Sequence, residues 1–195
     1  MSDWEERKLV KRLKARDTRA FREFVEAHEG RVFGLVFRIL GDREEAEDVS
    51  QEVFVTVFKA IDSFRQDSKL STWLYRIAVN HAKNRLKYLS RRGQNRKQPI
   101  QDTRETDLEP SHARRAQQPE QIAIGRQLEQ QVSVALSRLE EQYRVIIVLR
   151  DVNHLSYEEI GEITGLNLGT VKSRLHRARA ALRQWLEANR DWNKD

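Results

Sequence analysis

Cysteine is absent from the 195 residues of this chain, which excludes disulfide bonds, thiolate catalysis and zinc sites with cysteine ligands. Proline is scarce, because Pro99, Pro110 and Pro119 are the only three, so long helices can run through the rest of the chain. No apolar run approaches the about 20 residues that span a bilayer, and we expect no direct membrane insertion. The charged N-terminal stretch lacks the apolar centre of a signal peptide, so we expect a soluble, cytoplasmic protein.

Charge, by contrast, is abundant. Lys and Arg number 36 against 30 Asp and Glu, which gives a formal net charge of +6. A basic protein of this size has nucleic acid or an anionic membrane surface as its expected partner. Hydrophobic residues make up only 38% of the chain, which favours modest cores with wide solvated faces over one deep core.

A change of pattern divides the chain into two parts. Helical periodicity runs through residues 15–92 and again through 120–190. Residues 93–119 between them contain all three prolines, few apolar residues and no period, which is typical of a linker. The sequence therefore predicts an all-α protein with two small helical domains joined by a flexible linker.

Helices of the first domain have suitable residues at their ends. Asp17 or Thr18 is placed to cap one helix, and Gly41 is expected to end the apolar helix that follows. Asp42 and Glu45 have the spacing of a reciprocal capping box at the start of the next helix. The inner face of that helix carries Val49, Val53, Phe54, Val57 and Ile61, and its outer side carries Asp48, Gln51, Glu52, Thr56 and Lys59.

The last helix of this domain is basic on its exposed side and buries Leu74, Ala78, Ala82, Leu86 and Leu89. Recurring intervals of three and four place together Arg76, Asn80, Lys83, Asn84, Lys87 and Arg91. No acid occurs from Lys69 to Lys97, although like charges one helical turn apart repel, which suggests an anionic partner. Asn side chains can read base edges, and Trp73 and Tyr75 offer stacking surface for unpaired bases. The alternative is a solvated basic face with Trp73 in the core.

The second domain contains two helical patterns separated by a glycine. Ser156 and Glu159 form a predicted capping box, Gly165 ends the first helix, and Asn167 is placed to cap a helix at about 168–187. Outside its apolar stripe, that helix carries Lys172, Ser173, His176, Arg177, Arg179 and Arg183. This arrangement predicts a helix-turn-helix whose second helix enters the major groove of DNA. A helical hairpin used for protein contact is the alternative, and the isolated His176 gives no metal site.

Three stretches carry a resemblance to a known family: "EEAEDVSQEVF", "STWLYRIAVNHAKN" and "EEIGEITGLNLGTVKSRLHRARAAL". They resemble regions 2.2, 2.3–2.4 and 4.2 of bacterial RNA polymerase sigma factors of the sigma-70 family. The group resembled is the extracytoplasmic-function (ECF) type, which keeps only domains 2 and 4. The resemblance spans about residues 17–90 and 125–188, and three motifs in the family's order are more specific than any one alone.

The resemblance implies a role for each motif. The helix with Asp48, Gln51 and Glu52 would dock on the clamp coiled-coil of the largest subunit of RNA polymerase. The −10 element, in which the family flips a base out of the stack, would be bound by Trp73, Tyr75, Arg76, Asn80, Lys83, Asn84 and Lys87. The −35 element would be bound by Lys172, Ser173, His176 and Arg177. The linker would thread past the polymerase active centre.

We therefore interpret the chain as a sigma factor that directs core polymerase to promoter DNA and helps to open the −10 region. It would have no catalytic residue, cofactor or metal. A stand-alone helix-turn-helix regulator is the alternative, although it leaves the acidic helix and the Trp73 region unexplained. A nuclease is the second alternative, but the five His are dispersed and no carboxylate cluster has metal-ligand spacing.

Two further expectations come from the resemblance. Many family members are inhibited by an anti-sigma factor, often membrane-anchored, so we expect such a partner here. Lys69 and Leu70 depart from the usual approach to the "TWLYRIA" motif, and Leu168 departs from the usual residue before "GTVKSRL". His176 occupies a variable site, so promoter choice does not carry over from the family.

Overall fold

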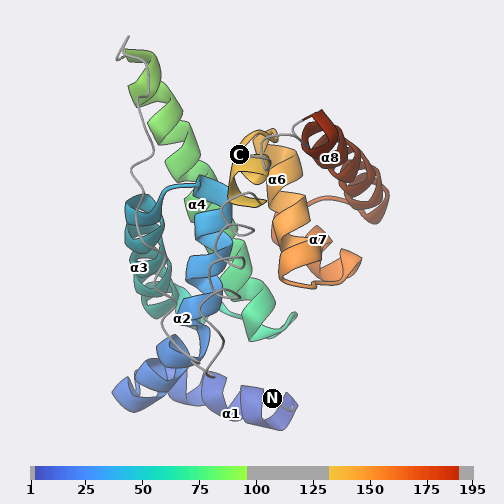
Figure 1. Ribbon diagram of the computed structural model, residues 1–195. Helices are drawn as coiled ribbons and strands as arrows, with labels where there is room; N and C mark the ends of the chain where they lie inside the picture. Colours follow the sequence, from blue (N-terminus) through green and yellow to red (C-terminus); the bar gives the residue numbers. More distant parts are fainter. Residues whose placement is uncertain (1–2, 96–131, 189–195) are drawn as a thin grey trace, which may run out of the picture.

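The computed structural model describes residues 3–95 and 132–188, and every regular element in these ranges is helical (Figure 1). The all-α prediction is therefore confirmed for the described residues. The N-terminal part contains α1 (Asp3–Lys14), α2 (Thr18–Leu40), α3 (Arg43–Ala60), the 3-10 turn η1 (Ile61–Ser63) and α4 (Leu70–Asn95). The C-terminal part contains a short helix at 132–137, then α6 (Glu141–Ile147), the π-helical turn η2 (Val148–Val152), α7 (Tyr157–Thr164) and α8 (Leu168–Ala188).

The helix ends of the N-terminal part follow the predicted caps, with one exception. The Asp17 carboxylate accepts from the backbone N–H groups of Arg19 and Ala20. Gly41 ends α2 in the left-handed conformation, with φ of 78°. Asp42 accepts from the Glu45 N–H, but the predicted reciprocal contact is replaced, because the Glu45 carboxylate binds a guanidinium on α4 instead.

Helices α2, α3 and α4 pack together around an apolar core. Val49, Val53 and Val57 on α3 are fully buried, as their shared face predicts. The predicted stripe of α4 is buried at Leu74, Ala78 and Ala82 and half-buried further along the helix. Close packing of these faces is the main source of stability for helices of this length.

The helix-turn-helix forms as predicted in the C-terminal part. Ser156 and Glu159 make the reciprocal capping box at the start of α7, and Gly165 ends that helix with φ of 72°. Asn167 accepts from the Thr170 N–H at 2.8 Å and so caps α8. α8 then packs through Val171 and its neighbours on the inner stripe, Leu175 and Ala178.

The two parts share one hydrophobic core and contact each other mainly through α4 and α7 (Figure 1). Arg144 on α6 donates to the Ile39 carbonyl at 2.7 Å, and its burial lowers the pKa of this guanidinium. The linker predicted at 93–119 lies, from residue 96 onward, outside the described residues. None of the described helices combines the length and apolar character needed to cross a membrane.

Candidate nucleic-acid interface

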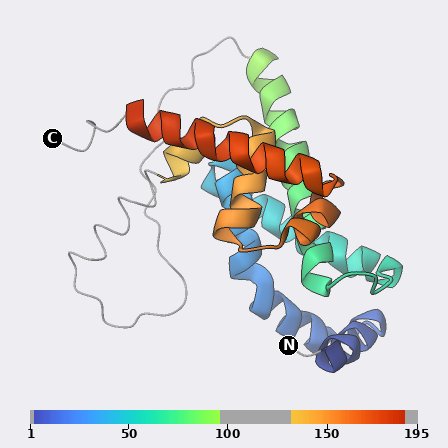
Figure 2. The same cartoon turned by 90° about the vertical axis from the view of Figure 1, so that its right-hand side faces the viewer.

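The predicted −35 residues all lie exposed on one side of α8. Lys172, Ser173, His176 and Arg177 occupy the first half of that helix, opposite its buried stripe. Figure 2 shows α8 crossing the front of the molecule, with α7 behind its N-terminal half. A recognition helix needs such an unobstructed N-terminal half, because those side chains are the ones that reach base edges in the major groove.

Tyr157, the first residue of α7, organises the cations around this surface. Its ring lies 5.9 Å from the Lys172 ammonium and 4.8 Å from the Arg150 guanidinium. Cation–π contacts of this kind hold flexible side chains close to an aromatic face. The sequence gives little sign of this role for Tyr157 apart from its position directly after the capping Ser156.

Not every arginine of α8 is available to DNA. Arg179 binds Asp151 on η2 through two contacts, at 3.1 and 2.5 Å. This pair ties the recognition helix to the body of the domain. Arg179 therefore has a structural role, although the sequence places it, like Arg183, outside the apolar stripe of the helix.

The α4 surface is more covered than the α8 surface. Asn80, Asn84 and Lys87 are exposed. Arg76 is half-buried, with its Nε enclosed and without a hydrogen-bond partner among the described residues. Lys83 is half-buried and lies 3.6 Å from the Glu141 carboxylate of α6. The predicted −10 face therefore lies partly against the C-terminal part of the molecule.

The two aromatic residues at the start of α4 differ in burial. Trp73 is half-buried and packs on Phe64 with a ring separation of 5.2 Å. Tyr75 is only 5% exposed, and its burial raises the pKa of the phenol. In this arrangement Trp73 keeps an accessible edge, whereas the Tyr75 ring is enclosed.

The predicted polymerase-binding residues Asp48, Gln51 and Glu52 are exposed on α3. Val55 and Phe58, which are also exposed there at 51% and 48%, extend the same helix with apolar surface. Exposed apolar groups beside carboxylates are typical of a protein-binding surface.

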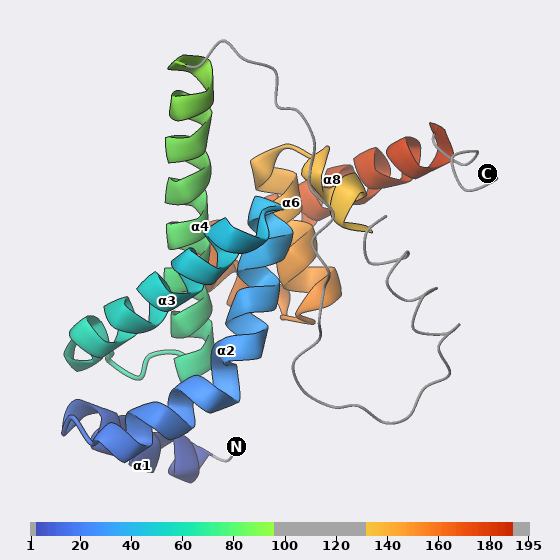
Figure 3. The same ribbon diagram turned by 60° about the vertical axis from the view of Figure 1, so that its left-hand side comes forward.

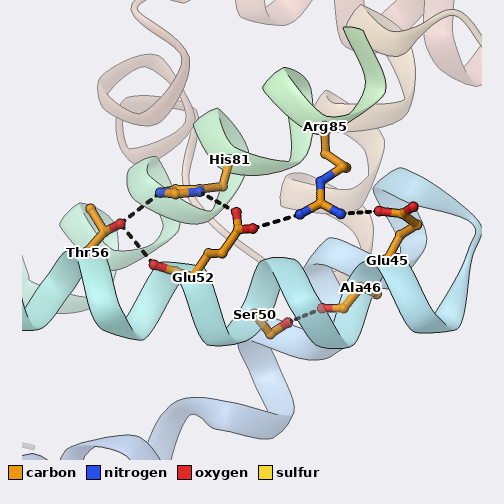
Figure 4. Close-up of polar contacts among 7 residues, drawn as sticks. All are labelled: Glu45, Ala46, Ser50, Glu52, Thr56, His81 and Arg85. Atoms are coloured by element: carbon orange, nitrogen blue, oxygen red, sulfur yellow. Dashed lines mark hydrogen bonds and ion pairs between the residues drawn. The ribbon is translucent and has the colours of Figure 1, made fainter. Parts of the chain in front are cut away.

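A polar network joins this α3 surface to α4 (Figure 4). Arg85 on α4 pairs with Glu45 and, at 2.7 Å, with Glu52. His81, one turn earlier, lies 2.9 Å from Thr56 Oγ1 and 3.4 Å from the second Glu52 oxygen. Glu52 is thus held from two sides, which fixes its carboxylate on the outer edge of α3. The described residues contain no His, Asp and Glu cluster suited to a metal ion.

Comparison with known proteins assigns these surfaces to a family. Residues 24–92 match Sigma-70 region 2, and residues 129–182 match Sigma-70, region 4. The chain is 37% identical over 187 residues to the RNA polymerase sigma-H factor of Pseudomonas aeruginosa, and the alignment covers 94% of each chain. The chain belongs to the ECF group of the sigma-70 family. Its function is therefore to confer promoter specificity on RNA polymerase, as a transcription initiation factor.

Two further relatives cover nearly the whole sigma factor. The ECF factor SigW of Bacillus subtilis is 34% identical, over 92% of this chain and 96% of its own. The ECF sigma-E factor of Escherichia coli is 39% identical, over 89% of this chain and 90% of its own. With relatives that align over both regions, the stand-alone regulator is not favoured.

Solved structures agree on the fold. CnrH, in complex with the cytosolic domain of CnrY, has a TM-score of 0.66 and 25% identity, over 94% of this chain and 98% of that chain. RpoE of Bartonella quintana, in complex with the anti-sigma factor NepR, has a TM-score of 0.65 and 23% identity, over 86% of this chain and 96% of that chain. At 23% identity, the second comparison shows the fold alone.

Proposed function

We propose that the two promoter elements are divided between the two parts of this sigma factor. Region 4, at residues 120–190, reads the −35 element through Lys172, Ser173, His176 and Arg177. Region 2, at residues 15–92, binds core polymerase and the −10 element, with 93–119 as the linker. The observation that carries the proposal is the exposed polar N-terminal half of α8 above a correctly capped helix-turn-helix.

The −10 strand is proposed to bind along α4. Asn80, Asn84 and Lys87 are already exposed, and the amide groups can both donate to and accept from base edges. Arg76 and Lys83 contribute positive charge on the same side, and the partly exposed Trp73 supports strand separation at the helix start, whereas Tyr75 is enclosed in the core. A flipped base needs such a surface, because it leaves the stack and must find new partners.

DNA binding along α4 requires the C-terminal part to move aside. Glu141 lies against Lys83, and Glu159 on α7 binds Lys69 at 2.9 Å. These carboxylates occupy positions that phosphate groups would take on the same cations. Core polymerase, by binding both parts at a fixed distance, replaces these contacts and raises the effective concentration of each part at its promoter element.

Core polymerase is proposed to dock on α3 through Asp48, Gln51 and Glu52, beside the exposed Val55 and Phe58. An anti-sigma factor that covers these surfaces is the proposed inhibitor, and CnrH, which is similar to this chain, was solved with a bound protein partner, the cytosolic domain of CnrY. The sigma factor is proposed to act in the cytoplasm, where polymerase and promoter DNA are found. It supplies no catalytic group, and the polymerase performs the chemistry.

Transcription from genomic DNA tests this assignment. The purified chain, core polymerase and the two together are incubated with the DNA, and transcript 5′ ends are mapped. We expect defined starts only with both proteins, preceded by shared sequences near −10 and −35. Initiation at no defined site, or failure of the chain to associate with core polymerase, would contradict the proposal.

A further inference from the structure

The N-terminal helix α1 lies outside the matched region 2 segment, which begins at residue 24. It is nevertheless firmly attached to the fold. Val10 and Leu13 are fully buried, and Arg12 binds Asp17 at 2.8 Å and Glu23 at 3.0 Å. Figures 1 and 3 show α1 lying across the lower end of α2, close to the point where α3 ends.

Two cations at the end of α1 hold the segment that joins α3 to α4. The Lys14 ammonium donates to the Phe64 carbonyl at 2.8 Å. Arg16 donates to the Phe58 carbonyl and pairs with Asp62 at 2.5 Å. Carbonyls at and beyond the end of a helix lack intrahelical partners, so these contacts satisfy acceptors that would otherwise need water.

Glu6 caps α4 across a sequence separation of 64 residues, because the Leu70 N–H donates to its Oε1 at 2.8 Å. Lys69, the residue directly before α4, has no acceptor on its side chain and cannot serve as a cap. A carboxylate at this place also interacts favourably with the helix dipole. The start of α4 therefore depends on a side chain from α1.

The segment held in this way supports Trp73. Phe64 is 3% exposed, and its ring packs on Trp73. Gln66, two residues further on, has φ of 61°, a left-handed conformation that a non-glycine residue keeps only where the surrounding structure holds it. The position of the Trp73 ring therefore depends on how firmly residues 64–69 are fixed.

We propose that α1 is a positioning element for −10 recognition, in which Glu6 and Lys14 fix residues 64–69 and the first turn of α4. Neither side chain touches DNA, because each acts through a backbone group, the Leu70 N–H or the Phe64 carbonyl. The inference rests on the proposed assignment of Trp73 and its neighbours to the −10 element. Loss of either contact displaces the support of Trp73 and leaves the α3 and α8 surfaces unchanged.

The test uses holoenzyme assembled from core polymerase and the full chain carrying Glu6→Ala or Lys14→Met. We expect each change to weaken binding of a single-stranded −10 oligonucleotide about three- to tenfold, the loss that one hydrogen bond produces. Affinity for core polymerase and protection of the −35 element should stay within about twofold. Lys11→Met is the matched control, since it makes the same chemical change at an exposed position of the same helix.

Glu6→Gln separates the contact from a general effect of mutation, because it keeps an acceptor for the Leu70 N–H and should bind the oligonucleotide nearly as wild type. A Gln variant as weak as the Ala variant would count against the contact. The proposal would be overturned if both Glu6→Ala and Lys14→Met bound the −10 oligonucleotide as tightly as wild type. It would also be overturned if these variants lost as much affinity for core polymerase and the −35 element as for the −10 oligonucleotide.

An Asn80→Ala variant distinguishes failure of this inference from failure of the −10 assignment. If Asn80→Ala weakens −10 binding while the α1 variants do not, only the role of α1 is refuted. If Asn80→Ala also leaves −10 binding unchanged, the placement of the −10 element on α4 is wrong, and the inference falls with it.

Discussion

On α8 the early cations Lys172 and Arg177 are exposed, whereas on α4 Lys83 and Arg85 are engaged with acidic side chains of other helices. Both helices are basic in sequence, yet their surroundings differ. α8 is the outermost helix of its part, and only its inner stripe is covered. α4 packs against α2, α3 and α7, and carboxylates from α3 and α6 reach its cations.

This difference indicates that the two proposed DNA-binding surfaces are available to different extents. Phosphate contacts made by already exposed cations need no rearrangement, so −35 binding should depend mainly on α8 itself and on salt. Binding of the −10 strand must first replace ion pairs within the protein. A positive residue therefore contributes to DNA affinity only to the extent that it is not already neutralised by a neighbouring carboxylate.

Charge reversal on the exposed helix should have the largest effect. Arg177→Glu removes a cation and adds a carboxylate beside DNA, so we expect −35 affinity of the holoenzyme to fall about ten- to hundredfold. Arg22→Glu on α2, an exposed arginine remote from α8, is the control and should change affinity by less than about twofold. Footprinting of both variants on one promoter measures the −35 affinity. Equal protection by the two variants would mean that α8 does not bind the −35 element.

Removal of the most engaged α4 cation should destabilise the fold. Arg85→Ala leaves Glu45 and Glu52 without their guanidinium, and the free energy of unfolding should fall by about 1–3 kcal/mol. Arg19→Ala, which removes an arginine that is 85% exposed from an i,i+4 pair, should cost at most about 0.5 kcal/mol. Urea unfolding of both variants gives the comparison. Equal losses would mean that the network in Figure 4 adds no more stability than a surface pair.

Repulsion between the two parts should make α4 more accessible. Glu141→Lys places a cation opposite Lys83, so free protein should bind a single-stranded −10 oligonucleotide about two- to fivefold more tightly. Glu140→Lys, at the adjacent exposed residue, makes the same charge change away from Lys83 and serves as the control. If both variants bound the oligonucleotide equally, the contact between Glu141 and Lys83 would not limit access to α4, and the contrast drawn between α4 and α8 would be wrong.

The smallest effect concerns pH and the contact between α7 and α4. The backbone hydrogen bond from Ser156, together with the Lys69 contact, lowers the pKa of the Glu159 carboxyl. A carboxyl with a lowered pKa stabilises the fold at pH values above its ordinary pKa. This stability is lost as the pH falls through the folded-state pKa. Glu159→Gln keeps the capping acceptor but loses the charge.

We therefore expect the Glu159→Gln variant to unfold more easily than wild type at about pH 7, by less than about 1 kcal/mol. The difference should shrink as the pH is lowered from about 7 to about 3, because protonation of the wild-type carboxyl removes its charge. Urea titrations at the two pH values measure it. A difference that persists in acid would assign the effect to packing and not to charge.

Much of the local structure follows from short stretches of sequence. Asp17, Gly41, Ser156 and Gly165 end or begin helices where their backbone and side-chain preferences predict, since caps depend on residues one to three positions away. The exposed set on α8 follows from helical periodicity for the same reason. The predicted reciprocal contact from the Glu45 side chain back to the Asp42 backbone was wrong, because the Glu45 carboxylate pairs with Arg85 on another helix.

Features that join distant residues were not predictable in this way. Glu6 gives no sign in the sequence that it caps Leu70, and Glu141 gives none that it pairs with Lys83. The sequence predicts exposed stacking surface for Tyr75 as well as for Trp73, yet Tyr75 lies in the core. Such contacts depend on how helices cross, and side-chain packing sets those crossings.

By itself, the sequence determined the helical fold class, the caps and the basic residues along α4 and α8, because each depends on chemistry within one or two helical turns. Only the tertiary structure decided which of those basic residues remain exposed, which are bound by carboxylates from other helices, and that α1 supports the start of α4. The physical reason is that a charge is neutralised by its neighbours in space, and the folded chain selects those neighbours.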